Sequence, residues 1–300
     1  MIRKDIIELF RVAAGKAVHL KDYNPGWDQT EEMEELGKDA IKERARQILD
    51  QNLADLAEAQ DLLYADDRYS VLIVLQALDA AGKDGTIKHV MSRVNPQGVD
   101  VFSFKQPSDE ELSHDFLWRY AVKVPQRGRI GIFNRSYYEE VLVVRVHQEL
   151  LKAQKLPPKL VDKRIWDERL TDIARFEDYL TRQGVVVLKF YLNLSRKEQK
   201  KRFMERLDKP DKNWKFSAAD VRERRYWDDY MHAFEEAISA TASKDAPWFV
   251  IPADNKWFSR LVVAAAIVEA VEQLDLEYPK VTHDQRKELA AARAELLAEK

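Results

Sequence analysis

Continuous apolar runs alternate with amphipathic segments along most of the chain. Runs rich in Val, Ile, Leu and aromatic residues predict strands, at 70–78, 99–104, 129–134, 185–194 and 247–253. The first run, SVLIVLQAL, has no polar alternation, which is typical of a strand buried on both faces. Helical patterns separate the runs, at 84–95, 109–121, 137–153, 160–182, 196–206, 217–242 and 256–274. This spacing predicts right-handed βαβ units, and therefore an α/β fold with a parallel sheet of about five strands flanked by helices.

The two ends of the chain depart from this pattern. Residues 21–30 are punctuated by Pro and Gly and predict a loop. A long amphipathic helix is expected next, from an N-cap at Thr30 to about Ala65. The last residues are charged, Ala-rich and helix-prone. The expected parts are an N-terminal loop and long helix over 1–66, a core over 67–280 and a charged tail over 281–300.

Composition narrows the class of protein. A net charge of −3 over 300 residues offers no general attraction for nucleic acid, so any basic function must be local. The chain has no Cys, which excludes disulfides, thiolate metal sites and Cys nucleophiles. We find no convincing signal peptide, and no stretch approaches the ~20 apolar residues of a membrane-spanning helix. We therefore expect a cytoplasmic protein.

The junction after the first apolar run reads LDAAGKDGT and is similar to a phosphate-binding loop. The usual loop is Gly-x-x-x-x-Gly-Lys-Ser/Thr; here Ala77 stands at the first Gly and Asp84 at the Ser/Thr position. Such a loop follows a buried strand and opens a helix, because backbone N–H groups converge there and the helix dipole adds to them. Gly82 and Gly85 let the backbone turn closely around an anion, and Lys83 brings a mobile positive charge to the phosphates.

Two carboxylates distinguish this loop from the usual pattern. Asp79 would repel a phosphate directly, unless a Mg²⁺ lies between them or the carboxylate takes a proton from an acceptor. Asp84 supplies a second carboxylate close to Lys83. The alternative is a strand–turn–helix connection with a capping Asp and no ligand. The combined pattern Asp-x-x-Gly-Lys-Asp-Gly-Thr, which begins at Asp79, argues against that alternative.

A second polar cluster, NRSYYEE, follows the run at 129–134. Its first residue, Asn134, stands where many phosphate-binding α/β proteins carry an acidic metal-orienting residue, and it can orient a water or a hydroxyl group. Arg135 offers a bidentate fork for phosphate oxygens at the carboxyl end of a strand, where open α/β sheets bind ligands. For Glu140 and one of the two tyrosines we favour a structural role at the start of a helix.

The segment 195–226 concentrates positive charge. It holds twelve Lys and Arg against six Asp and Glu, within a chain of net charge −3. Arg202 and Arg206 lie four residues apart on one predicted helix face, and the turn DKPDKNWKFS precedes a returning helix. Such a hairpin could close positive side chains over a phosphate site. A solvated, salt-bridged hairpin is the alternative, and nucleic-acid binding ranks lower because few aromatic residues are available for base stacking.

Taken together, these motifs resemble the family-2 polyphosphate kinases over nearly all of residues 30–280. The matching stretches are LDAAGKDGT (78–86), VNPQGV (94–99), FLWRY (116–120), FNRSYYEEVLVVRV (133–146), RLDKPDKNWKFS (206–217), RRYWDDY (224–230) and PWFVIPADNKWFSR (247–260). FNRSYYE looks most like the subgroup, often called class III, that phosphorylates both AMP and ADP. The resemblance implies a thymidylate-kinase-like P-loop fold with a helical lid at about 196–240.

The resemblance also implies an activity and its partners. We expect reversible, Mg²⁺-dependent phosphoryl transfer from inorganic polyphosphate to AMP or ADP, with Mn²⁺ able to replace Mg²⁺. It further implies a homo-oligomer, and no nucleic-acid or membrane partner. An ATP-dependent nucleoside or nucleotide kinase, or a non-catalytic polyanion- or RNA-binding protein, are the alternatives. The basic hairpin favours polyphosphate, since a single ATP needs fewer positive contacts.

Site residues follow from the matching positions. Asp79 is expected to bind metal or activate the acceptor, with Lys83 and Arg135 as the other catalytic residues. Asn134, Tyr137 and Glu139 are expected to join Arg135 at the nucleotide. The residues expected to bind polyphosphate are Ala81, Gly82, Lys83, Asp84, Gly85, Thr86, Lys88, Arg202, Arg206 and Lys215.

Overall fold

The computed structural model describes residues 3–27 and 38–299. Its centre is a single parallel sheet of five strands in the order β2-β3-β1-β4-β5. The strands are β1 (Ser70–Gln76), β2 (Val99–Ser103), β3 (Ile130–Asn134), β4 (Val185–Asn193) and β5 (Trp248–Pro252). Leu75 of β1 pairs with Asn134 of β3 and with Phe190 of β4, so the carboxyl ends of these strands lie close together on the same side of the sheet. The five strands expected from the apolar runs are confirmed.

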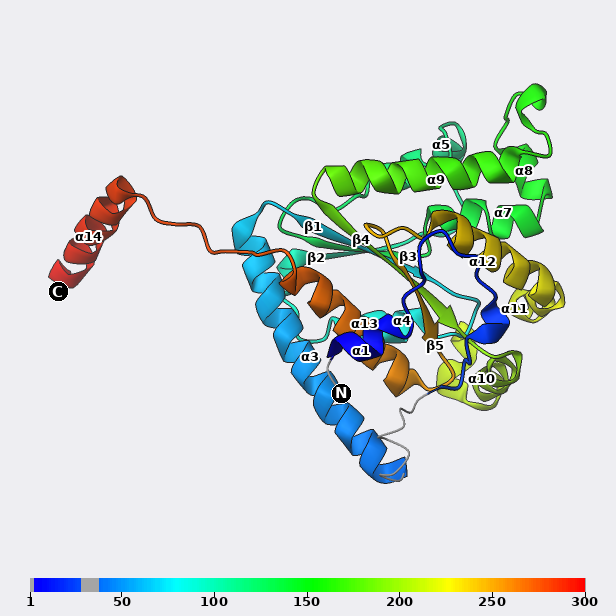
Figure 1. Cartoon of the computed structure of the whole chain (residues 1–300), viewed down its shortest axis with the longest axis horizontal. Coiled ribbons are helices and arrows are strands. Elements are labelled where there is room, and N and C mark those ends of the chain that lie inside the picture. Colours follow the sequence, from blue (N-terminus) through cyan, green and yellow to red (C-terminus); the bar gives the residue numbers. More distant parts are fainter. Residues whose placement is uncertain (1–2, 28–37, 300) are drawn as a thin grey trace.

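Helices cover both faces of this sheet (Figure 1). On one face lie α1 (Arg3–Glu8), α3 (Lys38–Asp66), α4 (Lys83–Val90) and α13 (Lys256–Glu272), and on the other α9 (Ile165–Arg182) and α12 (Trp227–Thr241). In β1, Val71, Ile73 and Leu75 pack against the first layer, and Leu72 and Val74 against the second. Because each side chain of β1 meets a helix layer, the strand carries no polar alternation.

Three predicted helices are interrupted. The segment 109–121 forms α5 (Asp109–Leu112) and α6 (Trp118–Ala121); 137–153 forms η3 (Tyr137–Glu140), α7 (Val143–Val146) and α8 (Glu149–Ala153); and 217–242 forms α11 (Ala218–Glu223), η6 (Arg224–Tyr226) and α12. Asp115 accepts a hydrogen bond at 2.9 Å from the N–H of Leu117, a local turn that competes with the helix. His147 leaves the helical region, with φ −113° and ψ 74°. Periodicity alone does not reveal such breaks.

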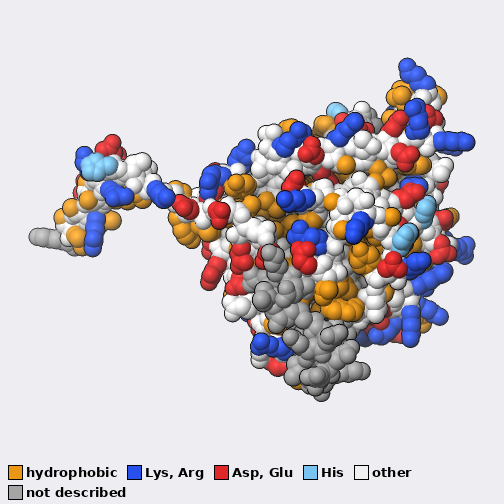
Figure 2. All heavy atoms as spheres, viewed as in Figure 1, with side chains coloured by type: hydrophobic (Ala, Val, Ile, Leu, Met, Phe, Trp, Pro, Cys, Tyr) orange, Lys and Arg blue, Asp and Glu red, His pale blue; other side chains and the backbone are white. Residues whose placement is uncertain are grey.

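The predicted lid is a helical hairpin beyond the end of β4. It consists of α10 (Arg196–Asp208), η5 (Pro210–Lys215) and α11. An ion pair of 3.5 Å between Arg206 and Asp220 joins its two arms. Figure 2 shows Lys and Arg side chains gathered over the region of α10 and α11. The remaining short elements are η1 (Leu20–Asp22), η2 (Pro96–Gly98) and η4 (Pro158–Leu160).

The two ends of the chain relate differently to the core. Near the N-terminus, the N–H of Val12 donates to Trp248 O at 2.8 Å and the N–H of Val250 donates to Phe10 O at 2.9 Å, so this segment pairs with β5. The expected N-cap at Thr30 lies outside the described residues. At the other end, every described residue of α14 (His283–Ala298) is exposed, and the helix stands off from the body (Figure 1). The three-part division of the chain stays a prediction.

Candidate active site

The turn between β1 and α4 has the shape of a phosphate cradle. Ala80 has a φ of 65° and Gly82 a φ of 111°, both in the left-handed region. Gly82 is the N-cap of α4, and its carbonyl accepts the N–H of Thr86 at 2.9 Å. A left-handed Ala costs about 1–2 kcal/mol, and such strained residues cluster at functional sites. The turn brings the N-terminal end of α4, with its positive dipole, to the end of the central strand.

Lys83 lies at the base of this turn. Its Nζ donates to the carbonyl of Ala77 at 2.7 Å. Burial lowers the pKa of Lys83 and the nearby Arg135 lowers it further, while Asp79, Glu139 and Asp84 act in the opposite direction. The ammonium group is therefore placed among charged groups that come from both β1 and β3.

Arg135 connects the ends of these two strands. Its Nη2 donates to Asp79 Oδ1 at 3.1 Å, and its Nη1 lies 3.8 Å from Glu139 Oε2. The backbone of Arg135 is also left-handed, with φ 65°. The carboxylate of Glu139 and then that of Asp79 raise the pKa of the guanidinium, against the effect of burial. For Glu139, burial raises the pKa of the carboxyl, while Arg135 and Lys83 lower it.

Asn134 holds the second carboxylate of the loop. Its Nδ2 donates to Asp84 Oδ1 at 2.8 Å and to Ser103 Oγ at 3.3 Å. The amide therefore binds a carboxylate that lies beside the helix N-terminus. An Asp at position 134 would instead place two negative charges face to face.

Two cavities meet at the pair formed by Asp79 and Arg135, because both residues line both cavities. The larger cavity, of about 620 Å³, contains the whole loop from Asp79 to Thr86 and is rich in Lys and Arg. The smaller cavity, of about 330 Å³, has an apolar and aromatic wall that includes Leu142, Trp227 and Phe234. The site thus joins a cationic space to a partly apolar one across a single ion pair.

Arg202 was expected to bind phosphate, but its side chain makes its contacts within the protein. It is buried, and all five of its N–H groups are directed at protein acceptors. Nε donates to Glu198 at 3.1 Å; Nη1 donates to the carbonyls of residues 80 and 81 at 3.0 and 2.9 Å; Nη2 donates to those of 253 and 254 at 2.7 and 2.9 Å. Arg202 therefore ties the phosphate loop to the segment after β5, and has no N–H group left for a phosphate.

The position of Tyr137 also corrects an expectation. This residue is fully buried, and its OH donates to Glu177 Oε1 at 2.9 Å. Tyr138 OH donates to the same oxygen at 2.8 Å, and Lys189 forms a buried ion pair with the other carboxylate oxygen of Glu177. Tyr137 belongs to a polar network behind the site and lines neither of the two cavities, because the η3 backbone turns its ring toward α9.

Of the other expected residues, some reach the larger cavity and some do not. Arg206 lines it while paired with Asp220. Lys88 is exposed on α4 and lines neither of the two cavities, because one further turn of helix carries it away from the loop. The side chain of Lys215 lies outside the described part of the structure. Glu139 lines the smaller cavity together with Arg135, and its expected place at the nucleotide stays a prediction.

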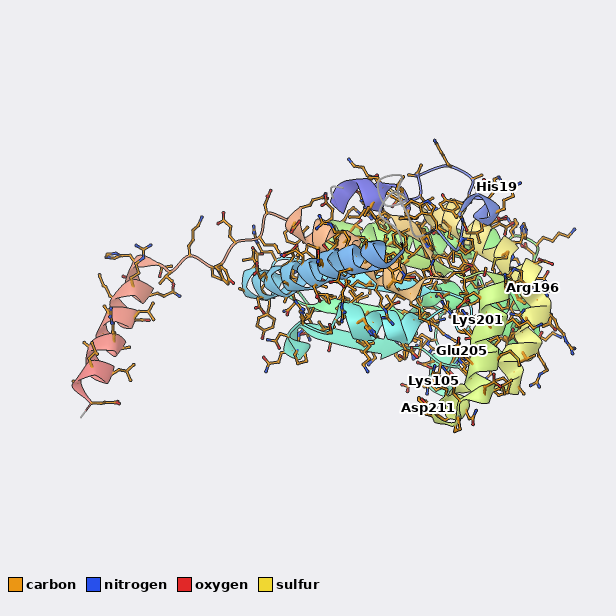
Figure 3. The ribbon with its side chains drawn as sticks, turned by 90° about the horizontal axis from the view of Figure 1, so that it is seen from below. His19, Lys105, Arg196, Lys201, Glu205 and Asp211 are labelled. Atoms are coloured by element: carbon orange, nitrogen blue, oxygen red, sulfur yellow. The ribbon has the colours of Figure 1, made fainter. Side chains whose placement is uncertain are left out.

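The sequence interpretation missed three cations that line the larger cavity. Lys105 follows β2, and Lys256 and Arg260 begin α13 after β5. All three follow the ends of predicted strands, so the strand-end rule applied to Arg135 would also have found them. Lys212, in the expected basic turn of the lid, lines the same cavity. Glu205 of α10 lines the same cavity. Figure 3 shows Lys105 and Glu205 close to the lid end of the molecule.

Arg119 explains how the segment carrying Lys105 is held. It is buried, its guanidinium lies 5.3 Å from the ring centre of Phe104, and its Nη2 donates to the carbonyl of Lys105 at 2.8 Å. Nη1 lies 3.4 Å from Glu111. This gives the FLWRY motif a physical role, since Arg119 fixes the loop that presents Lys105 at the cavity.

The donor set suits a metal that takes most of its ligands from a substrate. Within residues 3–27 and 38–299, no group of three or more His, Cys, Asp or Glu side chains could hold a metal ion by itself. Asp79 and Asp84 nevertheless line the larger cavity beside the phosphate loop. Mg²⁺ in phosphoryl-transfer sites is usually held by one or two carboxylates together with waters and substrate phosphates. These residues therefore fit such an ion.

A phosphate loop at the central strand, an Arg at the neighbouring strand end and a basic lid define a phosphoryl-transfer enzyme of the P-loop kinase type. The comparisons with known proteins identify the family. Residues 39–279 match the family Polyphosphate kinase 2 (PPK2), and the chain belongs to it. The enzymes of this family transfer phosphate between polyphosphate and nucleotides, and they generally need a divalent metal ion.

Similar proteins support this assignment over almost the whole chain. The ADP-polyphosphate phosphotransferase of Rhodopseudomonas palustris is 48% identical over 96% of this chain and 97% of its own length. The AMP/ADP-polyphosphate phosphotransferase of Meiothermus ruber is 44% identical over 90% of this chain and 95% of its own. The crystal structure of polyphosphate kinase 2 from Arthrobacter aurescens superposes with a TM-score of 0.85 at 39% identity, and the match covers 97% of this chain and 96% of that one.

Within the described residues, no helix is both long and apolar enough to cross a membrane.

Proposed function

We propose that this protein transfers the terminal phosphoryl group of inorganic polyphosphate to AMP and ADP, forming ADP and ATP, with Mg²⁺ as the metal. The names of the two relatives support ADP as an acceptor, and that of the M. ruber relative also supports AMP. Mn²⁺ is expected to replace Mg²⁺, since both accept carboxylate, phosphate and water oxygens. The cytoplasmic location and the homo-oligomeric state expected from the sequence stay predictions.

The observation that carries the proposal is the pair of cavities joined at Asp79 and Arg135. We assign the larger one to polyphosphate, because a uniform polyanion needs a track of cations. We assign the smaller one to the nucleotide, because Trp227 and Phe234 offer apolar surface for a nucleoside. An acceptor phosphate that reaches from the smaller cavity would then meet the end of the polymer at Arg135.

The proposed reaction is a direct, in-line displacement. An oxygen of the nucleotide's terminal phosphate forms a bond to the terminal phosphorus of polyphosphate. The bond from that phosphorus to the bridging oxygen breaks, and the shortened polymer leaves with the electron pair. Lys83 and Arg135 offset the negative charge on the transferring group and hold the two substrates in line. No covalent enzyme intermediate is needed.

Asp79 and Asp84 are the residues that would hold the metal against the phosphates. When bound, the metal neutralises charge on the donor phosphates and orients them. The ion pair with Arg135 and the hydrogen bond from Asn134 hold these two carboxylates in place at the loop.

The test combines purified protein, Mg²⁺, long-chain polyphosphate and either AMP or ADP, with the nucleotides separated by chromatography. We expect ADP and ATP to form. Asp79→Asn should reduce turnover roughly 100-fold or more, by the usual weight of a charge-stabilising group. The matched control is Asp245→Asn, at an exposed residue of the loop that enters β5. No ADP or ATP formation by the unaltered protein would contradict the proposal.

A further inference from the structure

Gln199 is a buried polar residue near the start of α10, where the lid joins the body. The residue is 3% exposed, and both ends of its amide are bonded within the protein. Its Nε2 donates to the carbonyl of Asp79 at 2.9 Å, and its Oε1 accepts a hydrogen bond from Nη1 of Arg224. Asp79 belongs to the phosphate loop, and Arg224 begins η6, where the returning arm of the lid meets α12. One side chain therefore connects three separate elements.

The chemistry of its two partners requires an amide at this position. A backbone carbonyl can only accept a hydrogen bond, and a guanidinium can only donate one. A side chain between them must donate at one end and accept at the other, and Gln does both within one planar group. A carboxylate at position 199 would keep the contact with Arg224 but would have no proton to donate to the carbonyl of Asp79.

The inner face of α10 holds the carbonyl side of the phosphate loop. Gln199 donates to the carbonyl of Asp79, and Arg202, three residues further along, donates to the next two carbonyls. The described peptides are all trans, so each N–H of the loop points opposite to the carbonyl before it. The N–H groups of Ala80 and Gly82 are therefore turned away from α10, and both residues line the larger cavity. Gln199 holds the first peptide of this series, the one that directly follows Asp79.

Arg224 lies on the other side of Gln199, at the smaller cavity. It lines this cavity together with Gln199, Asp79 and Arg135. In the part of the chain that the structure describes, only Nη1 of this guanidinium has acceptors, which are Gln199 Oε1 and the carbonyl of Arg196 at 3.2 Å. Burial and then the nearby Arg196 lower the pKa of Arg224. The bond to Gln199 thus fixes the direction of a guanidinium whose Nε and Nη2 remain for an anionic ligand.

We propose that Gln199 is a positioning residue for the transfer reaction, which holds Asp79 and Arg224 in a fixed geometry so that the two cavities stay aligned. The inference rests on the proposed function and deepens it. An acceptor in the smaller cavity meets a donor in the larger one only if the turn at Asp79 and the returning arm of the lid keep their distance, and Gln199 is bonded to both. A misplacement of about 1 Å in such a site can cost roughly 100-fold in rate.

The experiment compares the unaltered enzyme with Gln199→Met, Gln199→Glu, Arg224→Met and the double variant Gln199→Met/Arg224→Met. The Met at position 199 removes both hydrogen bonds, whereas Glu removes only the donor to the carbonyl of Asp79. We measure kcat and the KM for ADP with Mg²⁺ and long-chain polyphosphate saturating, at temperatures well below the thermal unfolding of each variant. The matched control is Gln51→Met, at an exposed residue of α3 whose amide donates to Asp55 at 2.7 Å.

Each variant has its own expected pattern. Gln199→Met should lower kcat roughly tenfold through the misplaced loop, and should also raise the KM for ADP. Gln199→Glu should lower kcat at least as much but leave the KM for ADP nearly unchanged, because the contact with Arg224 stays. Arg224→Met should mainly raise the KM for ADP, by about tenfold, because hydrogen bonds to charged groups are comparatively strong. In the double variant, the loss of kcat/KM should be smaller than the product of the single losses, because the second change removes a contact that the first has already broken.

Two results would overturn the inference. If Gln199→Met and Gln199→Glu lower the Tm but leave kcat unchanged, Gln199 only stabilises the fold. If the losses in the double variant equal the product of the single losses, Gln199 and Arg224 act independently. Should Gln199→Met not fold, the comparison of Gln199→Glu with Arg224→Met decides: a fall in kcat in the first and a rise in KM in the second support the inference, and the same pattern in both overturns it. Failure of the proposed function looks different, since the unaltered enzyme would then form no ATP from polyphosphate and ADP.

Discussion

Replacing Arg202 by Met distinguishes a structural arginine from a phosphate-binding one. The guanidinium donates to Glu198, to two carbonyls of the phosphate loop at residues 80 and 81, and to two carbonyls at 253 and 254 after β5. The side chain is 5% exposed. It therefore connects the turn after the central strand to the turn that leads into α13.

The size of the effect follows from these contacts. Removing one partner of a buried charged interaction costs about 3–5 kcal/mol, and four carbonyls would lose their donor. Water from the adjacent cavity can replace part of this, so we expect a loss of about 3 kcal/mol in the free energy of unfolding. At 2–4 °C per kcal/mol this lowers the Tm by roughly 6 to 12 °C. Because the phosphate loop loses its support, kcat should fall as well.

The assay is thermal unfolding followed by circular dichroism, without phosphate or polyphosphate. The matched control is Lys201→Met, on the same helix, where the side chain is 65% exposed and pairs with Glu198 at 3.2 Å. Its stability should stay within about 0.5 kcal/mol of the unaltered protein. If Arg202→Met unfolds at the same temperature as the unaltered protein and raises only the KM for polyphosphate, the structural interpretation is wrong and Arg202 binds the ligand directly.

Three further changes test the site. Burial lowers the pKa of Lys83 below its ordinary 10.5, so the unaltered enzyme should lose this charge, and with it kcat/KM, as the pH rises into the alkaline range. In Lys83→Arg this alkaline fall of kcat/KM should disappear, because the guanidinium stays charged. Because the pKa of Lys83 is lower in the folded state, the unfolded chain binds more protons than the folded one between the two pKa values, so the contribution of Lys83 to stability rises with pH there; an unchanged pH profile would refute the assignment. Tyr137→Phe should cost about 1 kcal/mol of stability, measured by urea unfolding, and leave the KM for ADP unchanged, because only the bond to Glu177 is lost; a raised KM would restore its expected place at the nucleotide. Asn134→Asp should lower the Mg²⁺ concentration needed for half-maximal activity, because it sets a carboxylate against Asp84 in place of an amide donor 2.8 Å away; an unchanged metal titration would count against a metal there.

The sheet could be predicted because its strands are buried on both faces. A strand that meets helices on each side, as β1 does, is apolar on both faces, and the unbroken run 71–75 stands out in the sequence. Helices 109–121 and 137–153 could not be delimited in the same way. Their breaks depend on single backbone angles and on one short side-chain contact, such as that of Asp115, which do not disturb the apolar pattern.

The centre of the candidate site was also within reach of the sequence. Parallel strands end at one edge of a sheet, so residues that directly follow strands β1 and β3 are brought together. Asp79 and Arg135 are paired in this way, and so are Asp84 and Asn134. Their chemistry as metal and phosphate residues stays a proposal, but their proximity was predictable from two short segments about fifty residues apart.

Residue type could not show which acceptors each cation would meet in the folded protein. Arg202 and Arg206 share a helix face at a spacing of four, yet Arg202 donates to backbone carbonyls of distant turns, whereas Arg206 pairs with Asp220 of the other arm of the lid. Whether an arginine is free depends on acceptors brought near it by the fold, and this is a property of tertiary structure. Lys256 and Arg260 show the opposite case, since both line the larger cavity and neither has an ion-pair or hydrogen-bond partner among the described residues, which their places at the start of a helix do not reveal.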